Sequence, residues 1–294
     1  MRIIKTVPNL SLARDKAILD KLINLCKNLP GVSLLDYSSD NDHNRTVVTL
    51  LGDYEAIKSG IITLARFALE NIDLNTHTGA HPRMGSVDVI PFVPIKNVTM
   101  EDCIQLSKEV GQILGELGIP VFLYEESATA AHRKNLVTIR KGGFEGMAEK
   151  MKNEKFKPDF GDSKPHPTAG VVAVGARMPL IAFNVNLNTS DINIAGNIAK
   201  AVRGSSGGFK HCKALGIMLE EKNIAQVSMN IVNYKNIPLY RVMEVIRMEA
   251  ARYGVNILGT EIIGLTPSQA LVESAAYYLQ LENFDENQVV ETHV

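Results

Sequence analysis

The segment around His81 carries the residue types best suited to proton transfer. It reads GAHPRMG from Gly79 to Gly85, and Asp88 follows closely. An imidazole can act as both acid and base near neutral pH because its ordinary pKa is about 6.5. The guanidinium of Arg83 could bind a carboxylate through two parallel hydrogen bonds. The residue types therefore suggest acid–base chemistry on a carboxylate substrate, while spacing alone leaves a purely structural histidine open.

A metal site is not expected in this chain. His77 and His81 have the i, i+4 spacing of a zinc pair on a helix, but Gly79 and Pro82 disfavour a continuous helix and no HExxH sequence occurs. The cysteines are odd in number, widely spaced and without a CxxC pair, which argues against a zinc ribbon and a disulfide framework: Cys26, Cys103 and Cys212. We therefore predict reduced thiols and no bound metal.

Three further polar segments could line a site. Residues 40–45, DNDHNR, carry enough carboxylate, amide and guanidinium groups to hold an amino acid, although such loops are commonly plain turns. Residues 159–170 form a long loop at the predicted domain junction, where pockets are common, and a simple linker is the alternative. Residues 203–210, RGSSGGFK, lack the ending of a P-loop, which favours a flexible loop beside a substrate over a nucleotide site.

Hydrophobic periodicity predicts the elements that must position these segments. Strands are expected at 3–7, 32–37, 46–51, 87–93, 120–124, 180–187, 214–219, 225–232 and 257–263. Helices are expected at 11–29, capped by Ser11, and at 53–71, 99–117, 191–202, 238–253 and 267–280. Between 125 and 167 the pattern weakens, and only a short helix near 144–152 is expected.

Each half can be read as β-α-β-β-α-β, which is the split βαβ, ferredoxin-like unit. We predict an α/β (α+β) protein of two ferredoxin-like subdomains related by duplication, at residues 1–175 and 176–294. The first carries an additional helix and strand. Many unrelated α/β chains alternate in this way, so chance similarity of the halves is the alternative.

Composition excludes several classes of partner. The 294 residues have a formal net charge of −1, so no global basic field exists to attract nucleic acid or anionic lipid. No apolar run approaches the roughly 18–20 residues of a membrane span, and the N-terminal apolar run is too short for a signal peptide. We expect a cytoplasmic protein without nucleic-acid or membrane partners.

Residues 79–94, GAHPRMGSVDVIPFVP, resemble the signature segment of the glutamate formimidoyltransferase (formiminotransferase) family. Other similar stretches are spread over most of the chain, at 44–46, 118–121, 158–161, 175–177, 180–187 and 221–228. One departure lies near the N-terminus, where residues 7–13 read VPNLSLA and the family usually has VPNFSEG. The resemblance implies two ferredoxin-like subdomains with folate between them, in a homodimer.

The resemblance also implies site residues and a place in metabolism. The family's catalytic histidine falls on His81. The folate-binding residues fall on Gly161, Asp162, Ser163, Lys164, Pro165, His166, Pro167, Thr168, Ala169 and Gly170, with a second short contact on Gly207, Gly208 and Phe209. The implied role is a one-carbon transferase of histidine catabolism, in the stand-alone form, so any cyclodeaminase would be a separate protein.

The implied reaction moves the formimino group of N-formimino-L-glutamate to N5 of tetrahydrofolate, the co-substrate. His81 would take the proton from N5 and give one to the departing glutamate nitrogen. We expect Asn44, Arg45 and Arg83 to orient carboxylates, and Asp88 to orient His81. Two alternatives remain: formyl transfer between 5-formyltetrahydrofolate and glutamate, and a folate-binding protein without catalysis.

Overall fold

The computed structural model describes residues 2–80 and 82–293, so His81 lies outside the described residues. The chain divides into two compact units, Met1–Arg177 and Met178–Val294. Each unit is described by itself.

The first unit is built on a mixed sheet. From one edge to the other its strands are β3 (Val32–Asp40), β4 (Arg45–Gly52), β1 (Ile3–Thr6) with β2 (Asn9–Leu10), β5 (Val87–Lys96), β7 (Val172–Ala176) and β6 (Val121–Glu125). The pairs from β3 to β5 are antiparallel, and β7 runs parallel to both β5 and β6. Both β1 and β2 lie between β4 and β5, so these two short segments act as one strand position.

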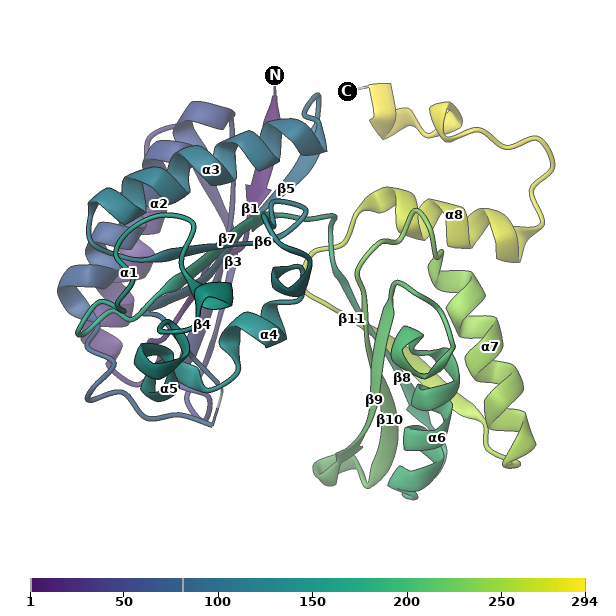
Figure 1. The fold of residues 1–294 in the computed structure, drawn as a ribbon. Coiled ribbons are helices and arrows are strands. Elements are labelled where there is room, and N and C mark those ends of the chain that lie inside the picture. The colour runs from purple at the N-terminus through teal and green to yellow at the C-terminus, as the bar shows by residue number, and fades with distance from the viewer. Residues whose placement is uncertain (1, 81, 294) are drawn as a thin grey trace. The chain divides into compact units, whose positions relative to one another are not determined.

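Helices cover the two faces of this sheet unequally. The long helices α1 (Lys16–Lys27), α2 (Tyr54–Asn71) and α3 (Met100–Glu116) pack on one face, and the short helices α4 (Leu136–Arg140) and α5 (Gly143–Lys150) lie on the other (Figure 1). Alternate residues of β5 serve the two cores: Ile90 and Phe92 pack with the long helices, and Val89 packs with the short ones. This alternation follows from the two-residue period of a strand.

Side-chain caps define where the long helices begin. Asp53 accepts a hydrogen bond from Ala56 N ahead of α2, and Thr99 and Asp102 form a reciprocal capping box ahead of α3. The predicted cap at Ser11 is wrong. Asp15 caps α1, while Ser11 is buried and donates through Oγ to the Gly85 carbonyl at 2.8 Å. Because β2 occupies residues 9–10, the chain needs further residues to leave the sheet before the helix can begin.

The weak region of the sequence contains more structure than predicted. Besides α5, it holds α4, and the strand β7 follows it. Every residue of β7 is buried because the strand lies between two parallel neighbours with helices over both faces. Such a strand reads as a short apolar run with no alternation, which periodicity cannot detect.

The second unit is an antiparallel sheet with helices packed on it. Its strand order is β11 (Ile257–Ile263), β8 (Ile181–Leu187), β10 (Ile224–Ile231) and β9 (Cys212–Leu219). The helices α6 (Ile192–Val202) and α7 (Leu239–Arg252) contribute most of the core with these strands, and α8 (Ser268–Leu279) adds Ala270. Short 3-10 turns complete the chain at Ala131–Arg133, Glu154–Phe156, Gly204–Ser206, Glu220–Lys222, Glu286–Gln288 and Val290–His293.

The two units share one strand order. Across the sheet of the second unit, from β11 to β9, the strands are the fourth, first, third and second along the chain. Across the first unit, β5, β1/β2, β4 and β3 are likewise the fourth, first, third and second of these strand positions along the chain. The predicted α/β (α+β) class with two ferredoxin-like subdomains is thereby confirmed. Their relation by duplication stays a prediction.

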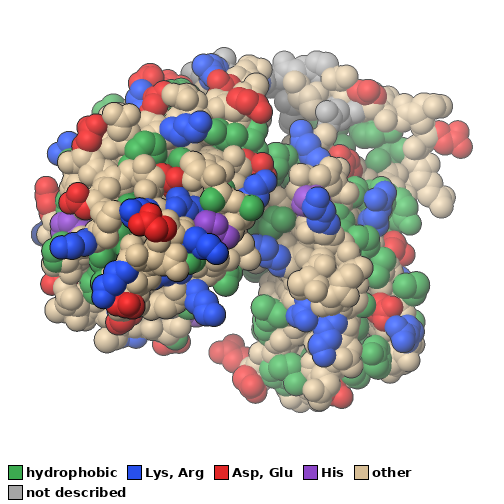
Figure 2. All heavy atoms as spheres, in the orientation of Figure 1, with side chains coloured by type: hydrophobic (Ala, Val, Ile, Leu, Met, Phe, Trp, Pro, Cys, Tyr) green, Lys and Arg blue, Asp and Glu red, His purple; other side chains and the backbone are tan. Residues whose placement is uncertain are grey.

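No helix within 2–80 and 82–293 is both long and apolar enough to cross a bilayer. Figure 2 shows basic and acidic side chains mixed over the visible face of each unit, in keeping with a formal net charge of −1.

A buried ion pair connects the region at 125–160 to β6. Asp159 bonds Arg133 Nη1 at 2.7 Å and accepts from Leu123 N at 2.8 Å, with both charged side chains under a tenth exposed. Asp159→Ala leaves a guanidinium buried without its carboxylate, so we expect a loss of roughly 3–5 kcal/mol in the free energy of unfolding.

Urea denaturation measures this loss. The matched control is Glu149→Ala, which removes a solvent-exposed carboxylate paired with Lys152. We expect the control to unfold like the unmodified protein. Equal stability of the two variants would contradict the assigned burial of the Asp159 pair.

Candidate active site

Asn44 joins three loops of the first unit. Its backbone has the left-handed φ of 48°, a conformation that asparagine adopts more readily than most residues. Its Oδ1 accepts from Ala13 N at 2.9 Å and Arg14 N at 3.0 Å, and its Nδ2 donates to the Thr78 carbonyl at 3.0 Å. The structure therefore places the side chain predicted to orient a carboxylate mainly in contacts between loops.

The backbone on both sides of position 81 is closely packed. A Cβ on Gly79 would lie 2.3 Å from the His43 carbonyl oxygen, so only glycine fits there, and Ala80 N donates to the Asp42 carbonyl at 3.0 Å. Further along the chain, Met84 N donates to Asp88 at 2.8 Å. Gly79, Ala80 and Met84 are thus held by contacts with other residues.

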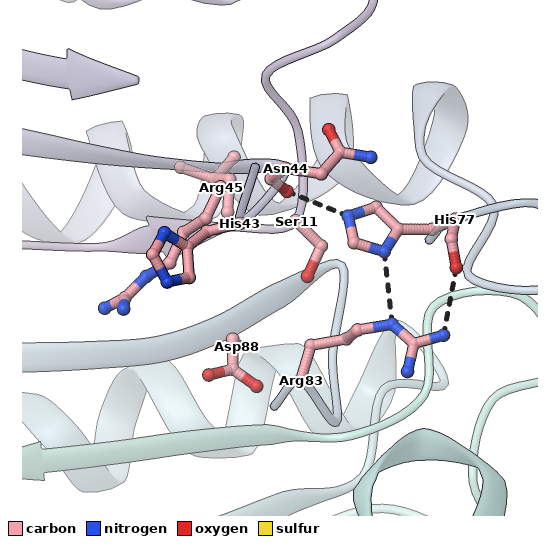
Figure 3. Close-up of a pocket in the computed structure, with 8 residues that line it drawn as sticks. Ser11, His43, Asn44, Arg45, His77, Arg83 and Asp88 are labelled. Atoms are coloured by element: carbon pink, nitrogen blue, oxygen red, sulfur yellow. Dashed lines mark hydrogen bonds between the residues drawn. The ribbon is translucent and has the colours of Figure 1, made fainter. Parts of the chain in front are cut away.

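Figure 3 shows the imidazole of His77 between Asn44 and Arg83. His77 Nε2 lies 2.8 Å from the Asn44 carbonyl oxygen, and Arg83 donates from Nε to His77 Nδ1 and from Nη2 to the His77 carbonyl, both at 3.1 Å. The other edge of the guanidinium pairs with both carboxylate oxygens of Glu145 at 2.8 and 3.1 Å. Burial lowers the pKa of His77 below its usual value, and the nearby Arg83 acts in the same direction.

A buried carboxylate with two guanidinium groups lies beside this cluster. Asp88, 3% exposed, accepts from Arg140 Nη2 at 2.6 Å as well as from Met84 N. Arg45 donates to Asn9 Oδ1, and burial lowers the pKa of Arg45 while Asp88 acts in the opposite direction. Two guanidiniums against one carboxylate leave an excess of positive charge, which favours binding of an anion.

Two hollows lie beside these groups. A narrow pocket is lined by Leu10, Ser11, His43, Asn44, Arg45, His77, Arg83 and Asp88 (Figure 3). A more open depression of about 740 Å³ shares His77 and Arg83 and is otherwise lined by Leu74, Asn75, Thr78, Gly79, Phe144 and Glu145. The predicted residues Asn44, Arg45, Arg83 and Asp88 are therefore brought together by the fold.

The second half of the predicted folate loop lies against the segment that follows Arg83. Ala169 O accepts from Ser86 N at 2.9 Å, and Val171 N donates to the Met84 carbonyl at 2.9 Å. This half of the folate loop also contacts the segment that follows α2, because the Thr168 carbonyl oxygen accepts from Leu74 N at 2.8 Å. Ala169 and Gly170 are buried by these contacts, whereas the residues at 161–164 are exposed.

The shorter predicted folate segment, 207–209, lies in the second unit after α6. Gly207 has a φ of 93°, which favours glycine, and a Cβ on Gly208 would lie 2.5 Å from the Ala201 carbonyl oxygen. Phe209 N donates to the Val202 carbonyl at 2.8 Å. Both glycines are therefore required by the local backbone.

Sequence reasoning missed part of this site. The sequence pattern indicates only a zinc ligand for His77 and only a helix cap for Ser11. Arg140 and Glu145 lie in the region at 125–167, where hydrophobic periodicity is weak. The signal available for His77 was its place in the same polar segment as His81. Among the described residues, no group of three or more His, Cys, Asp and Glu side chains is placed to hold a metal ion.

The two residues at the N-terminal departure from the family pattern are buried in this structure. Leu12 is 5% exposed and belongs to the large core, and Ala13 is fully buried. Neither side chain lines either hollow. The backbone of Ala13 still bonds Asn44, so the loop contact does not depend on the side chain at this position.

Two family models together match almost the whole chain. The model of the formiminotransferase domain, N-terminal subdomain, matches residues 3–177, and that of the formiminotransferase domain matches residues 182–294. The chain belongs to the formiminotransferase family. These two regions coincide closely with the two units of the structure.

Relatives match along the whole chain. It is 55% identical to the glutamate formimidoyltransferase of Streptococcus pyogenes serotype M1, covering 100% of this chain and 99% of that protein. It is 44% identical to the glutamate formimidoyltransferase of Thermoplasma acidophilum, covering 99% and 97%. The formimidoyltransferase-cyclodeaminase of Dictyostelium discoideum is 43% identical over 96% of this chain but only 54% of its own length.

A substitution at Gly79 tests the packing before position 81. Gly79→Ala places a methyl group against the His43 carbonyl, so the two loops must separate, and we expect the free energy of unfolding to fall by about 1–3 kcal/mol. The matched control is Gly146→Ala within α5, where a Cβ meets nothing within 4 Å. We expect the control to gain up to about 1 kcal/mol. Urea denaturation in which both variants gain stability would refute the close approach at Gly79.

Proposed function

We propose that this protein is a glutamate formimidoyltransferase that converts N-formimino-L-glutamate and tetrahydrofolate into 5-formiminotetrahydrofolate and L-glutamate. The observation that carries the proposal is the 55% identity to a glutamate formimidoyltransferase along the full length of both chains. Tetrahydrofolate is a co-substrate in this reaction.

The chemistry needs a proton carrier and close positioning of two substrates. N5 of the folate attacks the amidine carbon, a new carbon–nitrogen bond forms, and a tetrahedral adduct results. The adduct breaks down when the N5 proton has left and the glutamate nitrogen has gained one. One imidazole within reach of both nitrogens can perform both transfers, and His81 is the residue we assign to this role from the resemblance. Holding the two reactants together supplies much of the remaining acceleration.

The charges of the site fit the substrates. Formimino-glutamate carries two carboxylates and folate carries the carboxylates of its glutamate tail. The positive groups of the pocket, Arg45 and Arg83, are suited to bind them. Asn44 has most of its amide hydrogen bonds inside the protein, so we assign it to holding the loops in place.

We assign Asp88 an indirect role. Its carboxylate bonds Met84 N and Arg140, so it fixes the backbone that follows Arg83 and supplies the counter-charge for the pocket. Through that backbone it would hold the chain on which His81 is carried.

We assign folate contacts to two segments, 161–170 and 207–209. In the first segment the exposed residues at 161–164 are accessible to a ligand, while the buried residues at 169–170 fix the loop to residues 84–86, which precede β5. The second segment belongs to the other unit.

We further propose a cytoplasmic homodimer acting in histidine catabolism and one-carbon metabolism. The product, 5-formiminotetrahydrofolate, still carries a nitrogen on its one-carbon unit. An enzyme with cyclodeaminase activity would use it, and a separate protein could supply that activity.

The role of His81 is tested by His81→Ala. Loss of the proton carrier should lower kcat by about 10²–10⁴ while the protein stays folded. Circular dichroism checks the fold, and steady-state assay of free glutamate and 5-formiminotetrahydrofolate measures turnover. The control is His132→Ala, since that ring bonds the Lys155 carbonyl away from the pocket. Unchanged turnover in His81→Ala would remove this residue from the mechanism.

The same assay separates the proposed reaction from the alternatives. The unmodified protein is given either formimino-glutamate or 5-formyltetrahydrofolate with glutamate, and we expect transfer in the first case. Transfer of the formyl group alone would replace the proposed donor. Folate binding with neither transfer would make the protein a binding protein.

A further inference from the structure

The guanidinium of Arg83 has two edges with different partners. The inner edge donates from Nε to His77 Nδ1 and from Nη2 to the His77 carbonyl, both at 3.1 Å. The outer edge donates from Nη1 and Nη2 to Glu145. The side chain of Arg83 is 15% exposed and that of Glu145 is 65% exposed. The inner partner is therefore buried with the arginine, and the outer partner is a carboxylate in contact with water.

The hydrogen bonds of His77 determine its tautomer. A backbone carbonyl can only accept, so the contact of 2.8 Å between Nε2 and the Asn44 oxygen requires a hydrogen on Nε2. The Nε of an arginine can only donate, so Nδ1 must accept from Arg83. The ring is therefore neutral and uses both of its nitrogens. A protonated ring would direct a second N–H at the donor of Arg83.

We propose that His77 is a positioning residue that, as the neutral Nε2–H tautomer, directs the outer edge of Arg83 toward a carboxylate of the glutamate substrate, and that Glu145 occupies this edge until the substrate replaces it. This inference rests on the proposed function for the identity of the ligand. It adds a fixed orientation for Arg83 and a competing carboxylate within the protein.

The surroundings of the outer edge allow such an exchange. The edge opens on the depression of about 740 Å³ lined in part by Thr78, Gly79 and Phe144. Glu145 lies in the first turn of α5, and its pKa is lowered chiefly by its hydrogen bond with Arg83. Because Glu145 offers the same carboxylate group as glutamate, replacement exchanges one bidentate pair for another. The remaining groups of the substrate then supply the binding free energy that favours the substrate over Glu145.

The protonation state of His77 makes carboxylate binding by Arg83 sensitive to pH. The charges of Arg83, Arg14 and Glu145 act on the ring, with Arg14 placed by its hydrogen bond to Thr78 at 3.1 Å. The titratable or charged groups His43, Arg45 and Asp88 line the same pocket as His77. Burial is the main cause that lowers the pKa of His77, and both arginines act in the same direction. The ring is thus neutral at neutral pH and becomes charged only as pH falls below its ordinary value of about 6.5. Carboxylate binding should be lost as pH falls through that lowered pKa.

The test is calorimetric binding of L-glutamate to the full chain at about pH 7.5 and at about pH 5.5. We expect the unmodified protein to bind more weakly at the lower pH, by less than about tenfold because the pKa of His77 lies below its ordinary value. In His77→Gln, the amide can donate to Asn44 and accept from Arg83 but cannot be protonated. This variant should bind normally at about pH 7.5 and lose the acid weakening that depends on His77.

Two further variants separate orientation from competition. His77→Ala removes both bonds from the inner edge, so glutamate affinity should fall on the order of tenfold at both pH values. Glu145→Gln replaces the competing carboxylate with a neutral amide, so glutamate affinity should rise by a few-fold. His132→Gln is the matched control, because its ring also bonds a backbone carbonyl, that of Lys155 at 2.8 Å, and it should bind glutamate as the unmodified protein does.

The outcomes distinguish this inference from the proposed reaction, because binding is measured without turnover. Acid weakening that persists unchanged in His77→Gln would overturn the role of His77, and so would unaltered affinity in a folded His77→Ala. If His77→Ala does not fold, the pH comparison with His77→Gln decides the question. Glutamate binding that depends on His77, in a protein that transfers no formimino group, would refute the reaction and retain the positioning role.

Discussion

The set of hydrogen bonds made by Asn44 is the constraint on which the rest of the site depends. Its side chain joins the backbone of residues 13–14 to that of Thr78, and its carbonyl oxygen receives the imidazole N–H of His77. These segments are far apart in sequence and lie in loops, which have no regular hydrogen bonds of their own to hold them. One residue in a left-handed conformation therefore sets the relative position of the chain on which Arg83 and its neighbours are carried.

Burial gives the charged groups of this site their chemical character. Asp88 is almost fully buried and bonds Arg140, while burial lowers the pKa of the neighbouring Arg45. A guanidinium removed from water has lost part of its hydration, so it gains more from a carboxylate than an exposed guanidinium would. The sheet and its long helices supply a rigid base, and the loops at its edge supply the polar groups. The arrangement is suited to a substrate rich in carboxylates.

The sequence was informative where a local pattern decides the structure. Amphipathic helices and alternating strands predicted the two ferredoxin-like units, and caps such as Asp53 agree with the predicted start of α2. The strand β7 was missed because a parallel strand buried on both faces shows no alternation. Ser11 has the residue type of a cap, but its hydroxyl bonds Gly85, which is 74 residues away. Such a contact cannot be read from local sequence.

Part of the candidate site could be predicted as a group of residues, but the contacts of each residue could not. The polar residues at 44, 45, 83 and 88 do converge in the structure. Their individual partners depend on long-range contacts, so spacing could not reveal that Asn44 bonds backbone groups or that Arg140 pairs with Asp88. His77 was judged by a zinc pattern, although its two nitrogens serve a carbonyl and a guanidinium. The choice of His81 and of the folate segments came from the resemblance and remains a prediction.

The central claim is that this site transfers a formimino group intact from glutamate to folate. A single-turnover reaction with isotopically labelled formimino carbon, followed by NMR, tests this most directly. The account predicts that the label moves to N5 of tetrahydrofolate and that one glutamate appears for each label transferred. Label that stays on glutamate, or that is released into water in the presence of folate, would contradict it.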